Sequence, residues 1–257
     1  MTDNIKKRIN SGETTIGSWL QIGHPAVMEY MSSYDFDWLT VDLEHTDITL
    51  EGFSNLLRSA HGKNVFARVR ENNTLAIRQV LDVGANGVII PLVNNAEEAK
   101  KAVMAAKFPP MGIRGFAFFR ANKYGLDFAE YAKNANERIV VIVMVETKEA
   151  IENIDEILNV EGIDGVLIGP YDLSGSYNIP GQTQSSVILH AMKRVVSACK
   201  AHGKVAGMHQ VGLDAQQIKN VFADGFSFVA VGMDNVFLGK GLAETMDVLE
   251  NIRKGTQ

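Results

Sequence analysis

The chain has 257 residues, 46% of them hydrophobic, and its 25 basic and 30 acidic side chains give a formal net charge of −5, as in an ordinary globular protein. The charges are too evenly spread for a membrane span, and a nucleic-acid-binding protein would need a basic surface that this chain lacks. Cys199 is the only cysteine, which excludes an internal disulfide and a zinc site made of several thiolates, and the polar first ten residues contain no signal-peptide apolar run, so we expect a cytoplasmic protein.

Short runs rich in valine and isoleucine alternate along the chain with stretches of helical character. Continuous apolar runs of this length are typical of parallel strands that are buried on both faces. The predicted strands are residues 16–20, 38–41, 65–69, 87–90, 139–145, 165–168, 205–208 and 226–231.

Helices are predicted between these strands from the residues that can begin and end them. Asn95, Thr147 and Ser186 have side chains that can accept the first free amide hydrogen bonds of a helix, and a further helix is predicted from Asp214. Pro109 and Pro110 end the first of these helices, because proline cannot continue one. The predicted helices are residues 95–108, 147–158, 186–202 and 214–223.

Eight strand–helix units in a chain of this length predict a (β/α)₈ TIM barrel, formed as a single domain by residues 1–257. An open, doubly wound parallel sheet is the structural alternative. The first strand–helix turn, residues 21–25, lacks the GxGxxG pattern that would support a dinucleotide site, and no GxxxxGK[ST] loop is present. The barrel is therefore the favoured prediction.

Active sites of such barrels lie at the carboxyl ends of the strands, and charged or imidazole side chains follow one predicted strand after another here. Singly, each has an ordinary explanation as a helix cap or surface charge. Together on one rim they favour a catalytic site. The polar and aromatic side chains at these strand ends are Trp19, Gln21, Asp42, Glu44, His45, Arg70, Glu146, Asp172, His209 and Asp234.

The mixture of side chains indicates a type of chemistry. Glu146 and Asp172 on adjacent strands can hold one Mg²⁺ ion and leave positions for substrate oxygens. A nearby arginine can stabilise a developing oxyanion, and a histidine can move a proton. This set fits enolate chemistry beside a carbonyl. A Schiff-base aldolase would need a lysine at a strand end, where none is found, and a serine hydrolase would need a GxSxG elbow.

Several motifs then occur in a recognisable order. They are GSWL (17–20), DLEH (42–45), Arg70, LDVG (81–84), PPMGIRG (109–115), VET (145–147), GIDG (162–165) and GPYDLS (169–174). With these motifs the chain resembles the HpcH/HpaI aldolase family of metal-dependent pyruvate aldolases over about residues 4–250. It is most similar to the branch of 4-hydroxy-2-oxoheptanedioate and 2-dehydro-3-deoxyglucarate aldolases.

The resemblance implies a barrel whose last helix is exchanged with a neighbour, in a homohexamer built as a trimer of dimers. It implies a divalent metal, Mg²⁺ in the first place with Mn²⁺ or Co²⁺ as alternatives, held by Glu146 and Asp172. The substrate carboxylate would bind at Gly169, Pro170, Tyr171 and Asp172, where the backbone amides of the last two match the positions that hold it.

The resemblance also implies roles for the remaining catalytic residues. Arg70 matches the arginine that steadies the enolate oxygen, and His45 matches the base that acts through water on the 4-hydroxyl. Asp42 and Asp82 match the carboxylates that orient this histidine, the latter from a neighbouring subunit. Met144 stands where the relatives usually carry glutamine, which removes a polar group from the site.

The predicted activity is the reversible cleavage of a 2-oxo-4-hydroxy acid to pyruvate and an aldehyde. We expect strict recognition of the pyruvate half and loose recognition of the aldehyde half, because the expected mouth residues are mixed. They include Trp19, which is also a predicted substrate contact, His24, Thr46, Phe118 and Phe119. Two alternatives remain open, namely a citrate-lyase-like enzyme acting on CoA thioesters and a barrel with weak catalysis retained for assembly or binding.

Overall fold

The computed structural model describes residues 4–255 and contains a closed barrel of eight parallel strands, which confirms the predicted (β/α)₈ fold. β1 pairs with β2 on one side and with β8 on the other, so the sheet has no free edge. The strands are β1 (Thr15–Leu20), β2 (Trp38–Asp42), β3 (Asn64–Arg68), β4 (Gly87–Ile90), β5 (Val140–Val145), β6 (Gly165–Ile168), β7 (Val205–Gln210) and β8 (Phe228–Met233).

All eight predicted strands are present, and their ends differ from the predicted ends by at most two residues. The difference in β3 matters for the site. This strand ends at Arg68 and not at residue 69, so Arg68 belongs to the barrel wall and Arg70 to the loop that follows.

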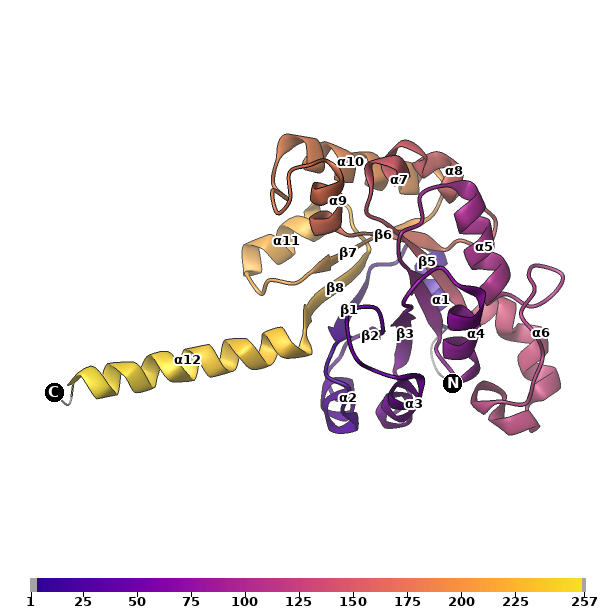
Figure 1. The fold of residues 1–257 in the computed structure, drawn as a ribbon, viewed down its shortest axis with the longest axis horizontal. Helices are drawn as coiled ribbons and strands as arrows, with labels where there is room; N and C mark the ends of the chain where they lie inside the picture. The colour runs from indigo at the N-terminus through magenta and orange to yellow at the C-terminus, as the bar shows by residue number, and fades with distance from the viewer. Residues whose placement is uncertain (1–3, 256–257) are drawn as a thin grey trace.

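Helices surround the barrel (Figure 1). The helices are α1 (Ile5–Asn10), α2 (Pro25–Ser32), α3 (Leu50–Ser59), α4 (Thr74–Asp82), α5 (Ala96–Ala106), the 3₁₀-helix η1 (Arg120–Gly125), α6 (Phe128–Arg138), α7 (Lys148–Glu152), α8 (Ile154–Leu158), α9 (Pro170–Ser176), α10 (Ser186–Ala201), α11 (Ala215–Ala223) and α12 (Asp234–Gly255). No helix among residues 4–255 is long and apolar enough to cross a membrane.

Three of the four predicted helix starts are confirmed by capping hydrogen bonds, whereas α10 begins at Ser186 as predicted but follows Ser185, whose side chain makes no capping bond. The side chains of Asn95, Thr147 and Asp214 accept amide hydrogens from residues three positions later, at 3.0, 3.1 and 2.8 Å. The predicted helix over residues 147–158 is interrupted at Asn153, which separates α7 from α8. The Asn153 side chain donates to the carbonyl oxygen of Asn94 at 2.9 Å, which ties this break to the loop after β4.

The barrel lumen and the layer between strands and helices are separate apolar cores. In the lumen, the rings of Trp38 and Phe228 stack with their centroids 4.2 Å apart. Ile5 and Ile9 of α1 join this core, and Lys6 of the same helix donates to the carbonyl oxygen of Ile139, which precedes β5. The amino-terminal end of the barrel is thus filled, and the carboxyl ends of the strands are left for a site.

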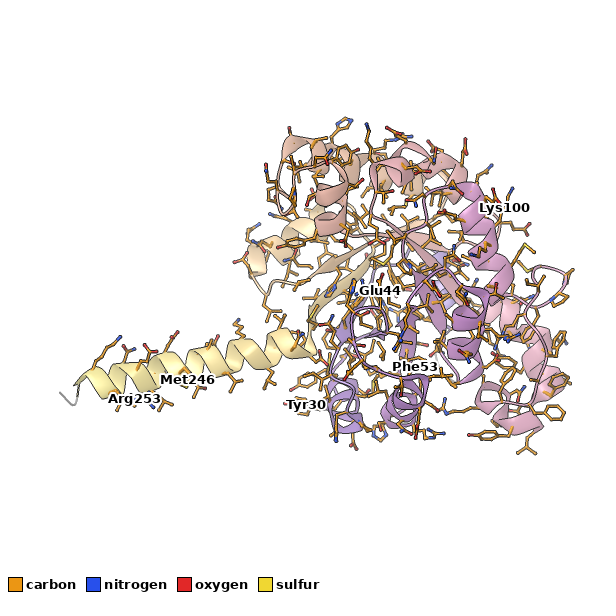
Figure 2. The ribbon with its side chains drawn as sticks, viewed as in Figure 1. Tyr30, Glu44, Phe53, Lys100, Met246 and Arg253 are labelled. Carbon is orange, nitrogen blue, oxygen red and sulfur yellow. The ribbon has the colours of Figure 1, made fainter. Side chains whose placement is uncertain are left out.

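The last helix departs from the usual barrel arrangement. Only the base of α12 contacts the barrel, where Phe237 packs against the core and Asp234 accepts the backbone N–H groups of Gln21 and Ile22; the rest of the helix projects away (Figure 1). In Figure 2, Met246 lies on this projecting helix, while Tyr30 of α2 lies at the edge of the barrel from which it departs.

Candidate active site

The carboxyl ends of β2 and β3 are joined by a buried ion pair between Asp42 and Arg68. The Nε and Nη2 atoms of Arg68 donate to the two carboxylate oxygens of Asp42 at 2.9 and 2.6 Å. Burial alone would raise the pKa of Asp42, but the hydrogen bonds and charge of Arg68 outweigh it and hold the pKa below its usual value. Strand pairing places the two residues side by side, because Asp42 is in register with Arg68.

Arg68 also contacts a second carboxylate and an aromatic face. Its Nη1 atom lies 3.1 Å from the Glu44 carboxylate, and its guanidinium carbon lies 4.6 Å from the ring centroid of Trp19. The Trp19 ring in turn stacks on His209, with centroids 4.8 Å apart. A cation on an aromatic face is favourable, so this stack and the two carboxylates fix the guanidinium at the barrel mouth.

Glu146 and Asp172 approach each other around Gly169. A Cβ atom built on Gly169 would lie 2.9 Å from Oε2 of Glu146 and 3.6 Å from Oδ2 of Asp172, so both carboxylates reach the same place and a side chain at position 169 would crowd the Glu146 oxygen. The other oxygen of Glu146, Oε1, accepts the backbone N–H of Leu92 at 2.8 Å. Oε1 of Glu146 is therefore held by the loop after β4, while Oε2 lies on the side of Asp172.

The electrostatics of this place favour a cation. Burial raises the pKa of Glu146 to about 7, against the lowering effect of the Leu92 hydrogen bond, and the charges of Asp172 and Glu44 raise it further. Burial likewise raises the pKa of Glu44, against the nearby Arg68. A carboxylate whose pKa is raised by burial and by neighbouring negative charges is stabilised in its charged form by a positive ion placed beside it.

The residues present fit a divalent metal with few protein ligands. Between residues 4 and 255, no three histidine, cysteine, aspartate or glutamate side chains are arranged to hold a metal together. Glu146 and Asp172 offer hard oxygen donors, and a cation bound by two carboxylates keeps positions open for water and substrate, as Mg²⁺ commonly does.

The structure does not bring Arg70 to these carboxylates, contrary to the role implied for it by resemblance. Its Nε and Nη2 atoms donate to the backbone carbonyls of Leu43 and Ile48 at 3.0 and 3.2 Å, and it lines a separate groove between α3 and α4. Because β3 ends at Arg68, Arg70 lies in the loop beyond the barrel wall. The arginine that lies in the site is Arg68.

The residues expected to work with His45 are also arranged differently. Oδ1 of Asp42 accepts the backbone N–H of His45 at 3.3 Å, while its ionic partner is Arg68 and not the imidazole. The His45 side chain is exposed at the rim, 3.7 Å from the Glu44 carboxylate. Asp82 ends α4 and pairs with Arg114 at 2.7 Å, so within one chain it is engaged elsewhere.

The remaining residues of the candidate site line a pocket of about 130 Å³. Trp19 and the predicted substrate-binding segment at the start of α9 are therefore brought together with Arg68 and His209. Met144, which is almost fully buried, contributes an apolar wall. The pocket is lined by Trp19, Gln21, Arg68, Met144, Leu167, Ile168, Gly169, Pro170, Tyr171, Asp172, His209, Val211 and Met233.

Sequence reasoning missed Arg68 and Leu92, and it gave Glu44 no role. Arg68 carried a usable signal, because a single arginine interrupts the apolar run that includes Val65 and Phe66. A charge inside a buried strand needs a partner, and the pair marks a site or a structural ion pair. Leu92 gave no signal, since its contribution to the site is a backbone N–H.

Comparison with known proteins places these features in a family context. A model of the HpcH/HpaI aldolase/citrate lyase family matches residues 15–239. A 2-keto-3-deoxy-L-rhamnonate aldolase of Escherichia coli O6:K15:H31 (strain 536 / UPEC) is 34% identical over 259 residues, which cover 99% of this chain and 96% of that protein.

Solved structures are similar over nearly all of the chain. A HpcH/HpaI aldolase/citrate lyase family protein from Burkholderia cenocepacia J2315 superposes with a TM-score of 0.91 at 28% identity, covering 98% of this chain and 100% of that one. The citrate synthase SbnG has a TM-score of 0.86 at 28% identity, covering 98% of this chain and 99% of that one.

Proposed function

The chain belongs to the HpcH/HpaI aldolase/citrate lyase family, and from this premise we propose that it is a metal-dependent aldolase. The proposed reaction is the reversible cleavage of a 2-oxo-4-hydroxy acid into pyruvate and an aldehyde. The observation that carries the proposal is the convergence of Glu146 and Asp172 on Gly169, next to a pocket that contains Arg68. The chain is accordingly a carbon–carbon lyase, and its relatives include an aldolase that acts on a 2-keto-3-deoxy sugar acid.

Glu146 and Asp172 would hold the metal, for which we propose Mg²⁺, with Mn²⁺ or Co²⁺ as substitutes. When bound, a divalent cation supplies positive charge that stabilises the enolate of pyruvate. The N–H of Leu92 keeps the Glu146 carboxylate in one orientation. The first turn of α9, at Tyr171 and Asp172, supplies backbone amides suited to the substrate carboxylate.

Arg68 takes the role that the resemblance implied for Arg70. Cleavage breaks the C3–C4 bond, the electron pair stays on the pyruvate half as an enolate, and the 4-hydroxyl loses its proton as the aldehyde forms. A guanidinium held by Asp42 and Trp19 before substrate binds needs no rearrangement when that negative charge develops. Its position in the pocket that Asp172 also lines supports this role.

His45 remains our proposed base for the 4-hydroxyl, acting through water from the exposed rim beside Glu44. The same residue would return a proton to C3 of the enolate, which yields the methyl group of pyruvate. Asp42 supports it indirectly, by binding the backbone N–H groups of Glu44 and His45 and so shaping the turn after β2.

The decisive experiment is an assay of pyruvate release from a 4-hydroxy-2-oxo acid before and after EDTA treatment. We expect activity that is lost with EDTA and restored by added Mg²⁺, Mn²⁺ or Co²⁺. Pyruvate release that is insensitive to EDTA would contradict the metal-dependent route, and the absence of any release would contradict the aldolase itself.

A second candidate is a reaction of a CoA thioester, which is favoured by the similarity to the citrate synthase SbnG. The same preparation separates the two functions when it is incubated with acetyl-CoA and a 2-oxo acid. Release of free CoA without pyruvate formation would favour this second function.

We further propose that α12 is exchanged between subunits, within the hexamer expected from the resemblance. Leu238, Leu242, Met246 and Leu249 recur at helical spacing along α12 and are all substantially exposed in the single chain. An apolar stripe of this length on a projecting helix is suited to packing on a second copy.

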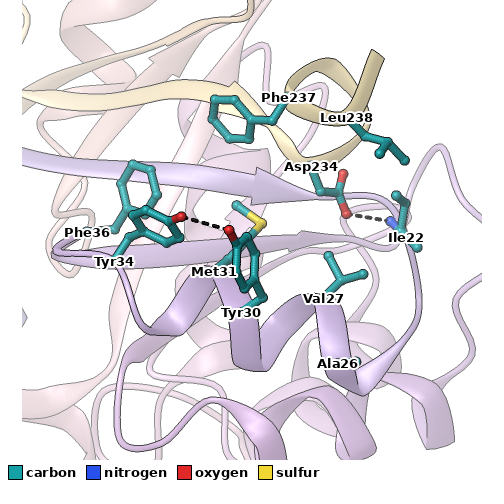
Figure 3. Close-up of a pocket in the computed structure, with 10 residues that line it drawn as sticks. All are labelled: Ile22, Ala26, Val27, Tyr30, Met31, Tyr34, Phe36, Asp234, Phe237 and Leu238. Carbon is teal, nitrogen blue, oxygen red and sulfur yellow. Dashed lines mark hydrogen bonds between the residues drawn. The ribbon is translucent and has the colours of Figure 1, made fainter. Parts of the chain in front are cut away.

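A groove on the same chain has the matching character. It has a volume of about 670 Å³ and lies between α2 and the base of α12 (Figure 3). Its walls are mostly apolar or aromatic, and the hydroxyls of Tyr30 and Tyr34 lie 2.9 Å apart on one side. A partner's α12 placed there would cover the barrel where the chain's own last helix does not.

The cytoplasmic location remains a prediction.

A further inference from the structure

His209, at the carboxyl end of β7, has a fixed ring orientation. Its Nε2 atom lies 2.9 Å from the carbonyl oxygen of Gly232, and its ring stacks on Trp19 with an angle of 12° between the planes. A carbonyl oxygen only accepts hydrogen bonds, so Nε2 must carry the proton in this contact. In the neutral ring, Nδ1 is therefore an unprotonated acceptor.

This acceptor is available to a ligand. Among residues 4–255, Nδ1 of His209 is not one of the fully enclosed side-chain atoms that lack a hydrogen-bond partner. An atom that receives no hydrogen bond and is not fully enclosed keeps accessible surface. No residue in that part of the chain donates a hydrogen bond to Nδ1. The ring is largely buried and lines the pocket that contains Arg68 and Asp172, so the open side of the ring is the pocket side.

We infer that His209 binds a hydroxyl group on the aldehyde half of the substrate, so that the enzyme favours hydroxyaldehydes over aldehydes with an alkyl group in the same place. The inference rests on the proposed aldolase function. Pyruvate offers only acceptor oxygens in its carboxylate and keto groups, and these suit Arg68 and a metal ion rather than an unprotonated nitrogen. Because the 4-hydroxyl is assigned to His45, the hydroxyl donor for His209 is a further one on the aldehyde half of the substrate.

The surroundings of His209 support a binding role. Met144, Leu167, Val211 and Met233 line the same pocket, so His209 is a polar acceptor set among apolar walls. Burial lowers its pKa to about 4, and Arg68 acts in the same direction, which keeps the ring neutral at physiological pH. So weak a base is poorly suited to remove a proton from an alcohol, but it accepts a hydrogen bond at neutral pH.

The test uses two aldehydes of nearly equal size, glycolaldehyde and propanal, each condensed with pyruvate by the metal-loaded enzyme. The hydroxyl of the first occupies the place of the methyl group of the second. We expect the wild type to favour glycolaldehyde by about tenfold in kcat/KM, the scale of one hydrogen bond to a neutral acceptor. His209→Phe and His209→Leu remove the acceptor and should bring this ratio close to one.

His209→Asn is the matched control, because its amide oxygen can take the place of Nδ1 although the stacking ring is lost. It should retain a preference for glycolaldehyde even if its total activity falls. The ratio between the two aldehydes is unaffected by a loss common to both, so a purely structural role of His209 would not change it.

Three results would overturn the inference. One is a wild-type enzyme that is active but does not distinguish the two aldehydes, which leaves the proposed aldolase function intact. Another is a His209→Phe or His209→Leu enzyme that keeps the wild-type ratio while losing activity equally toward both aldehydes, as expected if the ring only supports Trp19 and Arg68. The third is a wild type that forms no aldol product and releases no pyruvate, which also overturns the proposed function.

Discussion

Replacing Arg68 by alanine, with Arg70→Ala as the matched control, tests which arginine serves the active site. The Arg68 side chain is 10% exposed and that of Asp42 is fully buried. Removing Arg68 leaves a buried carboxylate without its partner, which costs about 3–5 kcal/mol of unfolding free energy. If its guanidinium also stabilises the enolate, kcat falls by about 10²–10³.

The control should behave quite differently. Arg70 is an exposed residue that donates hydrogen bonds to two backbone carbonyls, each contributing about 1 kcal/mol. Arg70→Ala should therefore lose little stability and change kcat by no more than a few-fold.

The double variant Arg68→Ala with Asp42→Asn separates folding from catalysis. A neutral amide at position 42 no longer leaves a buried charge unpaired, so part of the lost stability should return while kcat remains low. Stability is measured by urea unfolding, and turnover by pyruvate release together with exchange of the pyruvate methyl protons in D₂O.

The reasoning would be refuted if Arg70→Ala lost 10²-fold or more in kcat while Arg68→Ala retained turnover. A rise in KM with unchanged kcat for Arg68→Ala would also refute it, because the residue would then bind substrate and transition state equally.

Three further predictions concern the metal, the barrel base and the assembly. Glu146→Gln should abolish Mg²⁺-dependent activity and the rise in melting temperature on adding Mn²⁺, because one carboxylate holds the ion poorly; full activity in metal-free buffer would contradict this. Burial, together with the charge of Lys6, lowers the pKa of Lys107 from 10.5 to about 7. Between these two values the unfolded chain binds more protons, so the free energy of unfolding should rise from pH 7 to pH 10, and less so in Lys107→Met; equal rises in urea midpoint would count against this. Leu242→Asp combined with Met246→Asp should lower the oligomer mass in analytical ultracentrifugation, whereas Asn251→Asp on the opposite face should not; a monomeric wild type would exclude the exchanged helix.

Much of the fold could be predicted because its signals are local. A buried parallel strand is a short apolar run, and a helix start is marked by a side chain that accepts the first amide hydrogen bonds. Asn95 and Thr147 could therefore be assigned as caps before any contact was known. The break at Asn153 could not, because it depends on a hydrogen bond to Asn94 in a different loop.

Part of the candidate site could likewise be predicted from the sequence, and part of it could not. Glu146 and Asp172 follow directly after adjacent strands, and parallel strands bring their carboxyl ends to one rim, so their meeting at Gly169 followed from the sequence order. The arginine could not be assigned in this way. Arg68 and Arg70 are two residues apart near the end of one apolar run, and only the exact end of β3 decides which of them lies in the barrel wall.

The sequence by itself determined eight strand–helix units, their caps and a pair of carboxylates at neighbouring strand ends, because each depends on residue order and local propensity. Only the tertiary structure decided that Asp42 pairs with Arg68 and that Asp82 pairs with Arg114. These outcomes depend on strand register and on the burial of charges far apart in the chain. A charge selects its partner by the distance and dielectric that the closed fold imposes, and neither is present in the residue order.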